Sequence, residues 1–281
     1  MSFDETTPVA VGALTFDVRT AGPDDGTPVI LLHGFPENSR SWTSVVPTLT
    51  DAGLRIFAPD QRGYSPGARP LEVDDYTTDV LAGDVIGLAD ALGLGRFHLV
   101  GHDWGAAVAW VTAAHHADRL STLTAVSVPH LAAYGGALQN DPDQQQRASY
   151  IGLLRQPGKA EDLLLEDGAK RLRAMYQGGV PDAQLESYVA QLSEPGALTA
   201  ALNWYRAMQA DLSSLPPVTV PTTYVWSDQD LAIGRVPAEQ CVEFVDADYR
   251  FVELAGVSHW IPEQAPDALA AAIVDRVNSV R

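Results

Sequence analysis

Residues 97–107, Phe97-His98-Leu99-Val100-Gly101-His102-Asp103-Trp104-Gly105-Ala106-Ala107, decide how this 281-residue chain is interpreted. The first four predict a buried strand, and the alanine-rich segment 106–116 predicts a helix. Glycines stand two positions before and after Asp103, as in a sharp strand-to-helix turn that projects its central side chain. A carboxylate there can attack an electrophilic carbon and form an ester that must then be hydrolysed. Capping of the following helix is the alternative role for this Asp.

Short runs of apolar and β-branched residues recur along the first half of the chain. They cover residues 27–32, 54–58, 97–100 and 123–128, and each is followed within two residues by Gly or Pro. Runs of this length suit strands that are buried on both faces of a parallel sheet. Helical patterns over 75–92 and 106–116 alternate with them. The sequence therefore predicts an α/β fold with a mostly parallel, doubly wound sheet, whose functional residues lie at the carboxyl ends of strands.

The alternation of strand and helix patterns stops in the middle of the chain. From about residue 130 to residue 215 the patterns are helical, over 160–176, 181–192 and 197–212. Strand patterns return at 222–226 and 250–254, and a last helix is expected over 266–280. We therefore expect a core in two parts, residues 1–129 and 216–281, with a helical cap (lid) inserted over residues 130–215.

A histidine and an aspartate late in the chain are candidate partners of Asp103. His259 follows the last predicted strand, and Asp230 follows the strand predicted over 222–226. The order nucleophile, acid, histidine is that of triads built on such a turn. His259 would activate water, and the acid would bind its other ring nitrogen. Asp228 is the alternative acid, but it lies nearer the strand end, where stabilising the turn would explain it.

The formal net charge of −18, from 36 acidic and 18 basic residues, restricts the expected partners. Such a surface repels phosphate backbones and anionic lipid, so we expect neither nucleic acid nor a membrane as partner. With one cysteine, no ligand-spaced histidines and no phosphate-binding glycine loop, we expect no metal and no organic cofactor. The N-terminus lacks the pattern of a signal peptide, which predicts a cytoplasmic protein. A homodimer is the assembly that we consider.

With these residues assembled, the chain resembles the epoxide hydrolase and haloalkane dehalogenase branch of the α/β-hydrolase superfamily. The resemblance extends over nearly the whole chain. Its motifs are His33-Gly34-Phe35-Pro36, Asp60-Gln61-Arg62-Gly63-Tyr64, Gly101-His102-Asp103-Trp104-Gly105, Asp230 and His259. It implies an α/β-hydrolase fold with an inserted cap. Ser65 is a departure, because epoxide hydrolases generally have Gly there.

His33-Gly34-Phe35-Pro36 resembles the oxyanion-hole loop of this branch, in which the peptide bond before the proline is typically cis. The resemblance implies that the backbone N–H groups of Phe35 and Trp104 point at the ester oxyanion. Backbone donors need no particular side chain, so Phe35 can also line the pocket.

Two tyrosines in the predicted cap favour an epoxide as the substrate. Tyr205 lies in Asn203-Trp204-Tyr205-Arg206 and Tyr150 begins the segment 150–161, and both segments resemble those that carry the cap tyrosines of epoxide hydrolases. Opening an epoxide leaves an alkoxide that needs a proton donor, and tyrosine remains protonated at neutral pH. We interpret the chain as an epoxide hydrolase that converts a small hydrophobic epoxide and water to a vicinal diol. The residues expected to contact the substrate are Trp104, Phe35, Trp204 and Leu154.

A haloalkane or haloacid dehalogenase with the same nucleophile is the alternative. Trp104 could donate to a departing halide, but Phe35 replaces the Asn that supplies a second donor in haloalkane dehalogenases. Fluoroacetate dehalogenases are similar in the Phe35 loop, yet they carry Arg where Trp104 and Ala107 stand here.

A non-catalytic ligand-binding protein on the same fold is the third hypothesis. The intact set of Asp103, Asp230 and His259 disfavours it, because a protein that only binds a ligand has no need of the base.

Overall fold

An eight-stranded sheet forms the centre of the computed structural model, which describes residues 3–208 and 214–280. The order across the sheet is β1-β2-β4-β3-β5-β6-β7-β8. The strands are β1 (Thr6–Val11), β2 (Leu14–Ala21), β3 (Thr27–Leu32), β4 (Leu54–Pro59), β5 (Phe97–His102), β6 (Leu120–Val126), β7 (Thr222–Gln229) and β8 (Tyr249–Ser258). The β1–β2 and β2–β4 pairs are antiparallel and the other pairs are parallel. The mostly parallel sheet expected from the apolar runs is therefore present.

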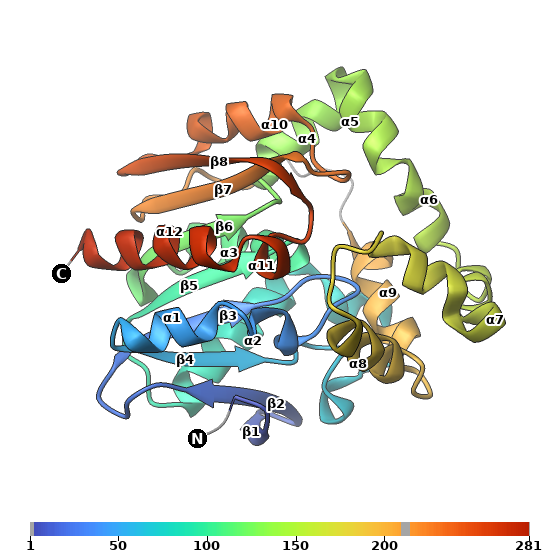
Figure 1. The fold of residues 1–281 in the computed structure, drawn as a ribbon, viewed down its shortest axis with the longest axis horizontal. Helices are drawn as coiled ribbons and strands as arrows, with labels where there is room; N and C mark the ends of the chain where they lie inside the picture. Colours follow the sequence, from blue (N-terminus) through green and yellow to red (C-terminus); the bar gives the residue numbers. More distant parts are fainter. Residues whose placement is uncertain (1–2, 209–213, 281) are drawn as a thin grey trace.

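Helices lie on both faces of the sheet and beyond one of its ends (Figure 1). On one face are α1 (Val46–Asp51) and α12 (Pro266–Asn278), and on the other are α2 (Thr78–Ala91) and α3 (Trp104–His115). Between β6 and β7 come α4 (Leu131–Asn140), α5 (Pro142–Arg147), α6 (Ile151–Leu154), α7 (Lys159–Met175), α8 (Asp182–Leu192) and α9 (Ala197–Ala207). Around β8 are α10 (Arg235–Gln240) and α11 (Ile261–Gln264). The 3-10 turns are η1 (Ser39–Trp42), η2 (Pro66–Ala68), η3 (Val73–Tyr76), η4 (Ala117–Arg119), η5 (Ala148–Tyr150) and η6 (Cys241–Phe244).

The central strands are buried on both faces, as their continuous apolar runs predict. In β3, Ile30 and Leu32 join the apolar cluster that contains α2 and α3, whereas Val29 and Leu31 join the cluster of α1 and α12. Successive strand residues point to opposite faces, so an alternating polar pattern is impossible here. In this strand order the carboxyl ends of β3, β5, β6 and β7 lie side by side, at the end of the sheet next to the helices that follow β6.

The segment between β6 and β7 is helical throughout its elements, as expected from the sequence. Helices α6 to α9 lie beyond the carboxyl ends of the parallel strands (Figure 1). The helix expected over 160–176 corresponds to α7, whose interior residues 166–169 depart from helical dihedral angles. The helix expected over 197–212 ends as α9 at Ala207, and residues 209–212 of that prediction lie outside the described residues.

The first two strands were not predicted from the sequence. Residues 6–11 and 14–21 pair as an antiparallel hairpin at the edge of the sheet. Most of β1 is exposed, so its sequence needs no continuous apolar run and gives no such signal.

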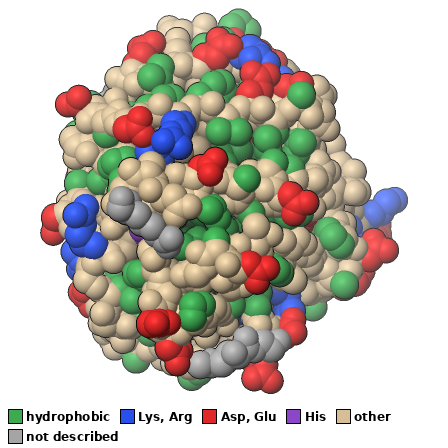
Figure 2. All heavy atoms as spheres, turned by 60° about the vertical axis from the view of Figure 1, so that its left-hand side comes forward, with side chains coloured by type: hydrophobic (Ala, Val, Ile, Leu, Met, Phe, Trp, Pro, Cys, Tyr) green, Lys and Arg blue, Asp and Glu red, His purple; other side chains and the backbone are tan. Residues whose placement is uncertain are grey.

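The acidic composition is visible on the surface. On the face drawn in Figure 2, Asp and Glu side chains are spread over the protein and clearly outnumber Lys and Arg. Among the helices of the described residues, none combines the length and the hydrophobicity that crossing a membrane requires.

Candidate active site

Asp103 lies in a strained turn between β5 and α3. Its backbone has φ 52° and ψ −120°, a conformation that costs an L-residue free energy. A Cβ at position 105 would lie 2.2 Å from the carbonyl oxygen of Leu32, and one at position 101 would lie 2.2 Å from the carbonyl oxygen of Gly105. Only glycine fits at both positions, which explains the spacing around Asp103. The Asp103 side chain makes no cap hydrogen bond to α3, so capping is not its role here.

The structure brings His259 between the two predicted carboxylates. Its Nε2 is 3.4 Å from Oδ2 of Asp103, and its Nδ1 is 3.0 Å from both carboxylate oxygens of Asp230. Asp230 also accepts hydrogen bonds from the backbone N–H groups of Ala232 and Ile233. Asp228, within β7, instead accepts from the backbone N–H of Gly256 in β8, at 2.7 Å, and so links these neighbouring strands rather than stabilising a local turn.

The electrostatic environment keeps both aspartates ionised and His259 protonated in the resting state. Burial by itself raises the pKa of Asp103, but the hydrogen bond and positive charge of His259 outweigh it and lower that pKa. Burial likewise raises the pKa of Asp230, which His259 and the Ser127 hydroxyl lower. Burial opposes protonation of His259, yet the charges of Asp230 and Asp103 raise its pKa well above the usual value.

The loop after β3 supplies a hydrogen-bond donor to the nucleophile. The backbone N–H of Phe35 donates to Oδ1 of Asp103 at 2.9 Å, and the nearby backbone N–H of Trp104 lowers the pKa of this carboxylate. The Phe35–Pro36 peptide bond is cis. A Cβ at position 34 would lie 2.4 Å from Oδ1 of Asp103, so only glycine allows the loop to approach this closely.

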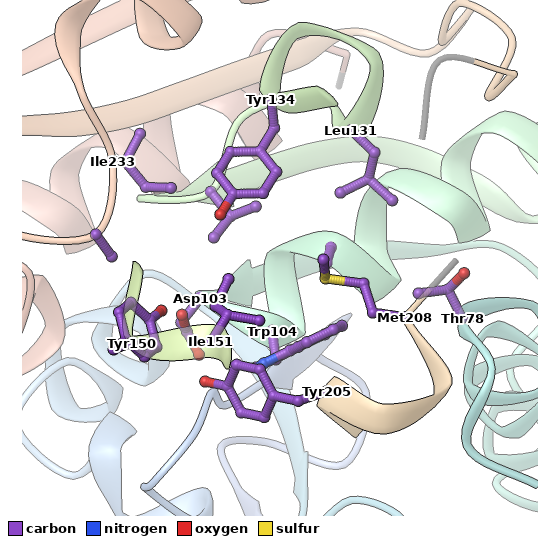
Figure 3. Close-up of a pocket in the computed structure, with 13 residues that line it drawn as sticks. Thr78, Asp103, Trp104, Leu131, Tyr134, Tyr150, Ile151, Tyr205, Met208 and Ile233 are labelled. Carbon is purple, nitrogen blue, oxygen red and sulfur yellow. The ribbon is translucent and has the colours of Figure 1, made fainter. Parts of the chain in front are cut away.

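Two cavities meet at Asp103. The inner cavity, with an empty volume of about 600 Å³, is lined mainly by apolar and aromatic side chains, including Trp104, Leu131 and Tyr134 (Figure 3). The outer cavity, about 690 Å³, is lined by residues that include Phe35, His259 and Trp260. Asp103, Tyr150 and Tyr205 line both cavities.

The two tyrosines project from the helical segment toward the nucleophile. In Figure 3, Tyr150 and Tyr205 lie beside Asp103 and Trp104. The ring of Tyr205 packs edge-on against those of Trp104 and Tyr150, with ring centroids 5.1 Å and 6.4 Å away, respectively. Burial is the main reason that the pKa of each tyrosine is well above 10, so both hydroxyls keep their protons at neutral pH.

Two of the four residues expected to contact the substrate line neither cavity. Trp204 packs edge-on against Trp104, with ring centroids 5.8 Å apart, and its indole N–H donates to the carbonyl oxygen of Arg62. Leu154 is buried in the apolar core. Both side chains face inward from their helices, and sequence spacing alone does not distinguish a core face from a cavity wall. Trp104 lines the inner cavity and Phe35 the outer one.

Sequence reasoning missed Ser127, which contacts both Asp230 and His259. Its hydroxyl donates to Oδ2 of Asp230 at 2.7 Å and lies 3.0 Å from Nδ1 of His259. Ser127 directly follows β6 and has φ 69°. The acid that binds the histidine could also have followed β6. A polar side chain directly after that strand, here the Ser127 hydroxyl, could therefore have been recognised from the sequence as part of the site.

With this geometry described, comparison with known proteins identifies the family. Residues 27–266 match the family model described as alpha/beta hydrolase fold. The chain belongs to the α/β-hydrolase fold family. It is 35% identical over 266 residues to AB hydrolase superfamily protein YfhM of Bacillus subtilis (strain 168), covering 92% of each chain. It is 31% identical to Epoxide hydrolase A of Mycobacterium tuberculosis (strain ATCC 25618 / H37Rv), again covering 92% of each.

Solved structures of this α/β-hydrolase family are similar over the whole chain. One, described as novel epoxide hydrolases belonging to the alpha/beta hydrolases superfamily in metagenomes from hot environments, has a TM-score of 0.88 at 32% identity, covering 99% of each chain. Epoxide Hydrolase A from Mycobacterium thermoresistibile has a TM-score of 0.85 at 28% identity, with the same coverage.

Proposed function

We propose that this protein hydrolyses small hydrophobic epoxides to vicinal diols through an ester on Asp103. One observation carries the proposal: a strained, buried carboxylate and two protonated tyrosine hydroxyls line the same two cavities. A nucleophile and a proton donor on either side of a bound epoxide are what ring opening requires. The similarity to proteins named epoxide hydrolases supports the same activity.

The first step is ring opening. An Asp103 carboxylate oxygen attacks one epoxide carbon, the bond from that carbon to the epoxide oxygen breaks, and the oxygen takes a proton from Tyr150 or Tyr205. Because the Asp103 pKa is lowered, the nucleophile is ionised at neutral pH, and because the tyrosine pKa values are raised, the donors are protonated. Esterification removes the negative charge of Asp103.

The second step is hydrolysis of the ester. Loss of the Asp103 charge removes one of the interactions that raise the pKa of His259, so this ring can pass its proton to the tyrosinate that ring opening leaves and then act as a base. His259 then takes a proton from water, which attacks the ester carbonyl carbon. The N–H of Phe35 already donates to this carboxyl group and the N–H of Trp104 lies near it, and both would stabilise the oxyanion. The ester C–O bond then breaks, the departing oxygen takes the proton of the carboxylic acid that forms at Asp103, and the diol leaves with Asp103 again ionised and His259 protonated.

The tyrosine arrangement favours this reaction over dehalogenation. Trp104 carries the indole N–H that a departing halide would need, but its ring packs edge-on against Tyr205, whose side chain lines both cavities. A substrate panel with diol formation and halide release measured in parallel tests the choice. We expect diol from epoxides and no halide. Halide release from haloalkanes at a comparable rate would contradict the proposal.

Isotope labelling tests the covalent route. In a single turnover in ¹⁸O-water, the label should enter the Asp103 carboxyl group and be absent from the diol. Asp103→Asn should abolish turnover, and His259→Gln should accumulate the ester, detected by mass spectrometry. His115→Gln is the matched control, because His115 is an exposed histidine on α3. Label found in the diol of the first turnover would exclude the ester.

A further inference from the structure

Four side chains and one backbone carbonyl group form a line of contacts that ends at His259. Tyr188 of α8 donates its hydroxyl proton to Oε1 of Glu263 in α11, at 3.1 Å. The carboxyl group of Glu263 acts on that of Glu37, which follows the oxyanion loop, and each shifts the pKa of the other. Oε2 of Glu37 is 3.0 Å from Nδ1 of His102, at the end of β5, and Nε2 of His102 is 2.9 Å from the backbone carbonyl oxygen of His259.

The carbonyl end of this line fixes the direction of its hydrogen bonds. A carbonyl oxygen only accepts, so Nε2 of His102 must carry a proton and donate to His259. His102 is fully buried, and burial together with the charge of His259 lowers its pKa, so its ring is neutral. Nδ1 of a neutral ring that is protonated on Nε2 is an acceptor. The donor in the contact between His102 and Glu37 must therefore be the Glu37 carboxyl group.

The next link requires a second proton. Oε1 of Glu37 and Oε2 of Glu263 are buried, and neither has a partner when both groups are written as carboxylates. With Glu37 donating through Oε2, its Oε1 is free to accept, so Glu263 donates to it as a neutral acid. Oε1 of Glu263 then accepts from Tyr188. The two carboxyl groups and the His102 ring each then use one donor and one acceptor, and no buried oxygen of the two carboxyl groups is left unpaired.

We propose that Glu37 and Glu263 are neutral acids in a one-way hydrogen-bond chain, which runs from Tyr188 through His102 to the backbone carbonyl of His259 and positions the base. The surroundings favour the neutral forms. Burial is the main cause that raises the pKa of Glu37 to about 7 and the pKa of Glu263 well above its usual value. The chain thereby ties a helix of the insertion to the backbone of the base.

The role in catalysis rests on the proposed function, whereas the protonation states do not. Glu37 is half deprotonated near pH 7 by its raised pKa, so the donor to His102 is present below that pH and is lost as pH rises through it. The other titratable groups that act on Glu37 or Glu263 are Asp103, His259, Tyr64 and Tyr176. His259 and Asp103 act on Glu37 in opposite directions, since His259 lowers its pKa and Asp103 raises it.

Spectroscopy on the intact protein tests the protonation states without any substrate. Difference infrared spectra between wild type and Glu263→Gln, and between wild type and Glu37→Gln, should each lose the carbonyl stretch of a protonated carboxyl group at pH 6. Glu72→Gln is the control, because Glu72 is exposed and should lose only carboxylate bands. Nitrogen-15 NMR should find His102 neutral with its proton on Nε2. Carboxylate bands at both positions, or a doubly protonated His102, would overturn the proposal.

Kinetics test whether the chain positions the base. Glu37→Ala should slow ester hydrolysis by about ten-fold, the cost of one lost hydrogen bond to a buried group. Glu37→Gln retains a donor and an acceptor, so it should restore most of that loss and remove the decline in hydrolysis rate as pH rises above about 7. Equal loss in both variants, with unfolding temperatures like wild type, would show that the charge of Glu37 matters and would overturn the chain. If wild type makes no diol at all, the proposed function fails while the spectroscopic result stands.

Discussion

Gly34→Ala tests how closely the oxyanion loop must approach the nucleophile. A Cβ at this position would lie 2.4 Å from both Cβ and Oδ1 of Asp103, whereas ordinary contacts begin near 3.4 Å. The loop or the carboxylate must therefore move by about 1 Å. Misplacement of that size typically costs about 100-fold in rate, equivalent to about 2.7 kcal/mol of barrier. The Phe35 N–H, now 2.9 Å from Oδ1, should lose its alignment in the same movement.

The assay is kcat/KM for diol formation, together with the single-turnover rate of ester formation per folded molecule. Gly83→Ala is the matched control, because a Cβ there meets no atom within 4 Å. We expect the control to retain wild-type rates and an unchanged or slightly higher unfolding temperature, since alanine favours helix α2. A Gly34→Ala variant that is folded and within about three-fold of wild type would refute the reasoning, because the loop would then tolerate the displacement.

Three further predictions follow from the same contacts. Leu154→Ala should lower the free energy of unfolding, measured in urea, by about 2–5 kcal/mol and leave KM nearly unchanged, because Leu154 is in the core. A large change in KM with full stability would instead place Leu154 in the substrate site. Ser127→Ala removes a hydrogen-bond donor to Asp230 and should slow ester hydrolysis by about ten-fold more than ester formation. Stopped-flow kinetics that separate the two steps would measure the difference. Equal slowing of both steps would contradict a role of Ser127 in supporting His259. As pH falls, ester hydrolysis should be lost before ester formation, because hydrolysis needs an unprotonated His259, whose pKa the charge of Asp230 still raises in the ester, whereas ester formation needs an ionised Asp103, whose pKa is lowered; loss of both steps at one pH would contradict this order.

The sequence was most informative where function imposes a local pattern. The glycines around Asp103 are dictated by backbone contacts only 2.2 Å from their missing Cβ atoms, so they appear as a motif in the chain itself. Asp230 and His259 follow predicted strands, and parallel strands bring their carboxyl ends together. The central strands could be predicted equally well from the sequence, because burial on both faces requires a continuous apolar run.

The directions of side chains in the helical insertion were much harder to predict from the sequence. Trp204 and Leu154 were expected to contact substrate, yet each faces the interior, because a helix among other helices has more than one apolar side. The contacts of Glu37 and Glu263 are invisible to spacing for a different reason. Their partners are 65 and 75 residues away along the chain and meet only through tertiary packing.

Four buried carboxyl groups lie around one histidine, and the number of donors they receive separates them into two kinds. Asp230 accepts from two backbone N–H groups, from Ser127 and from His259, and Asp103 accepts from the backbone N–H of Phe35 and from His259, with the backbone N–H of Trp104 nearby. Their charges are stabilised by these donors and raise the pKa of the base between them. Glu37 receives one backbone N–H, that of Gly34, and Glu263 receives the Tyr188 hydroxyl, so burial dominates and both favour the neutral acid. Two further negative charges there would hold His259 protonated even after Asp103 is esterified. Keeping Glu37 and Glu263 neutral therefore lets the loss of one charge, on Asp103, release the proton of His259.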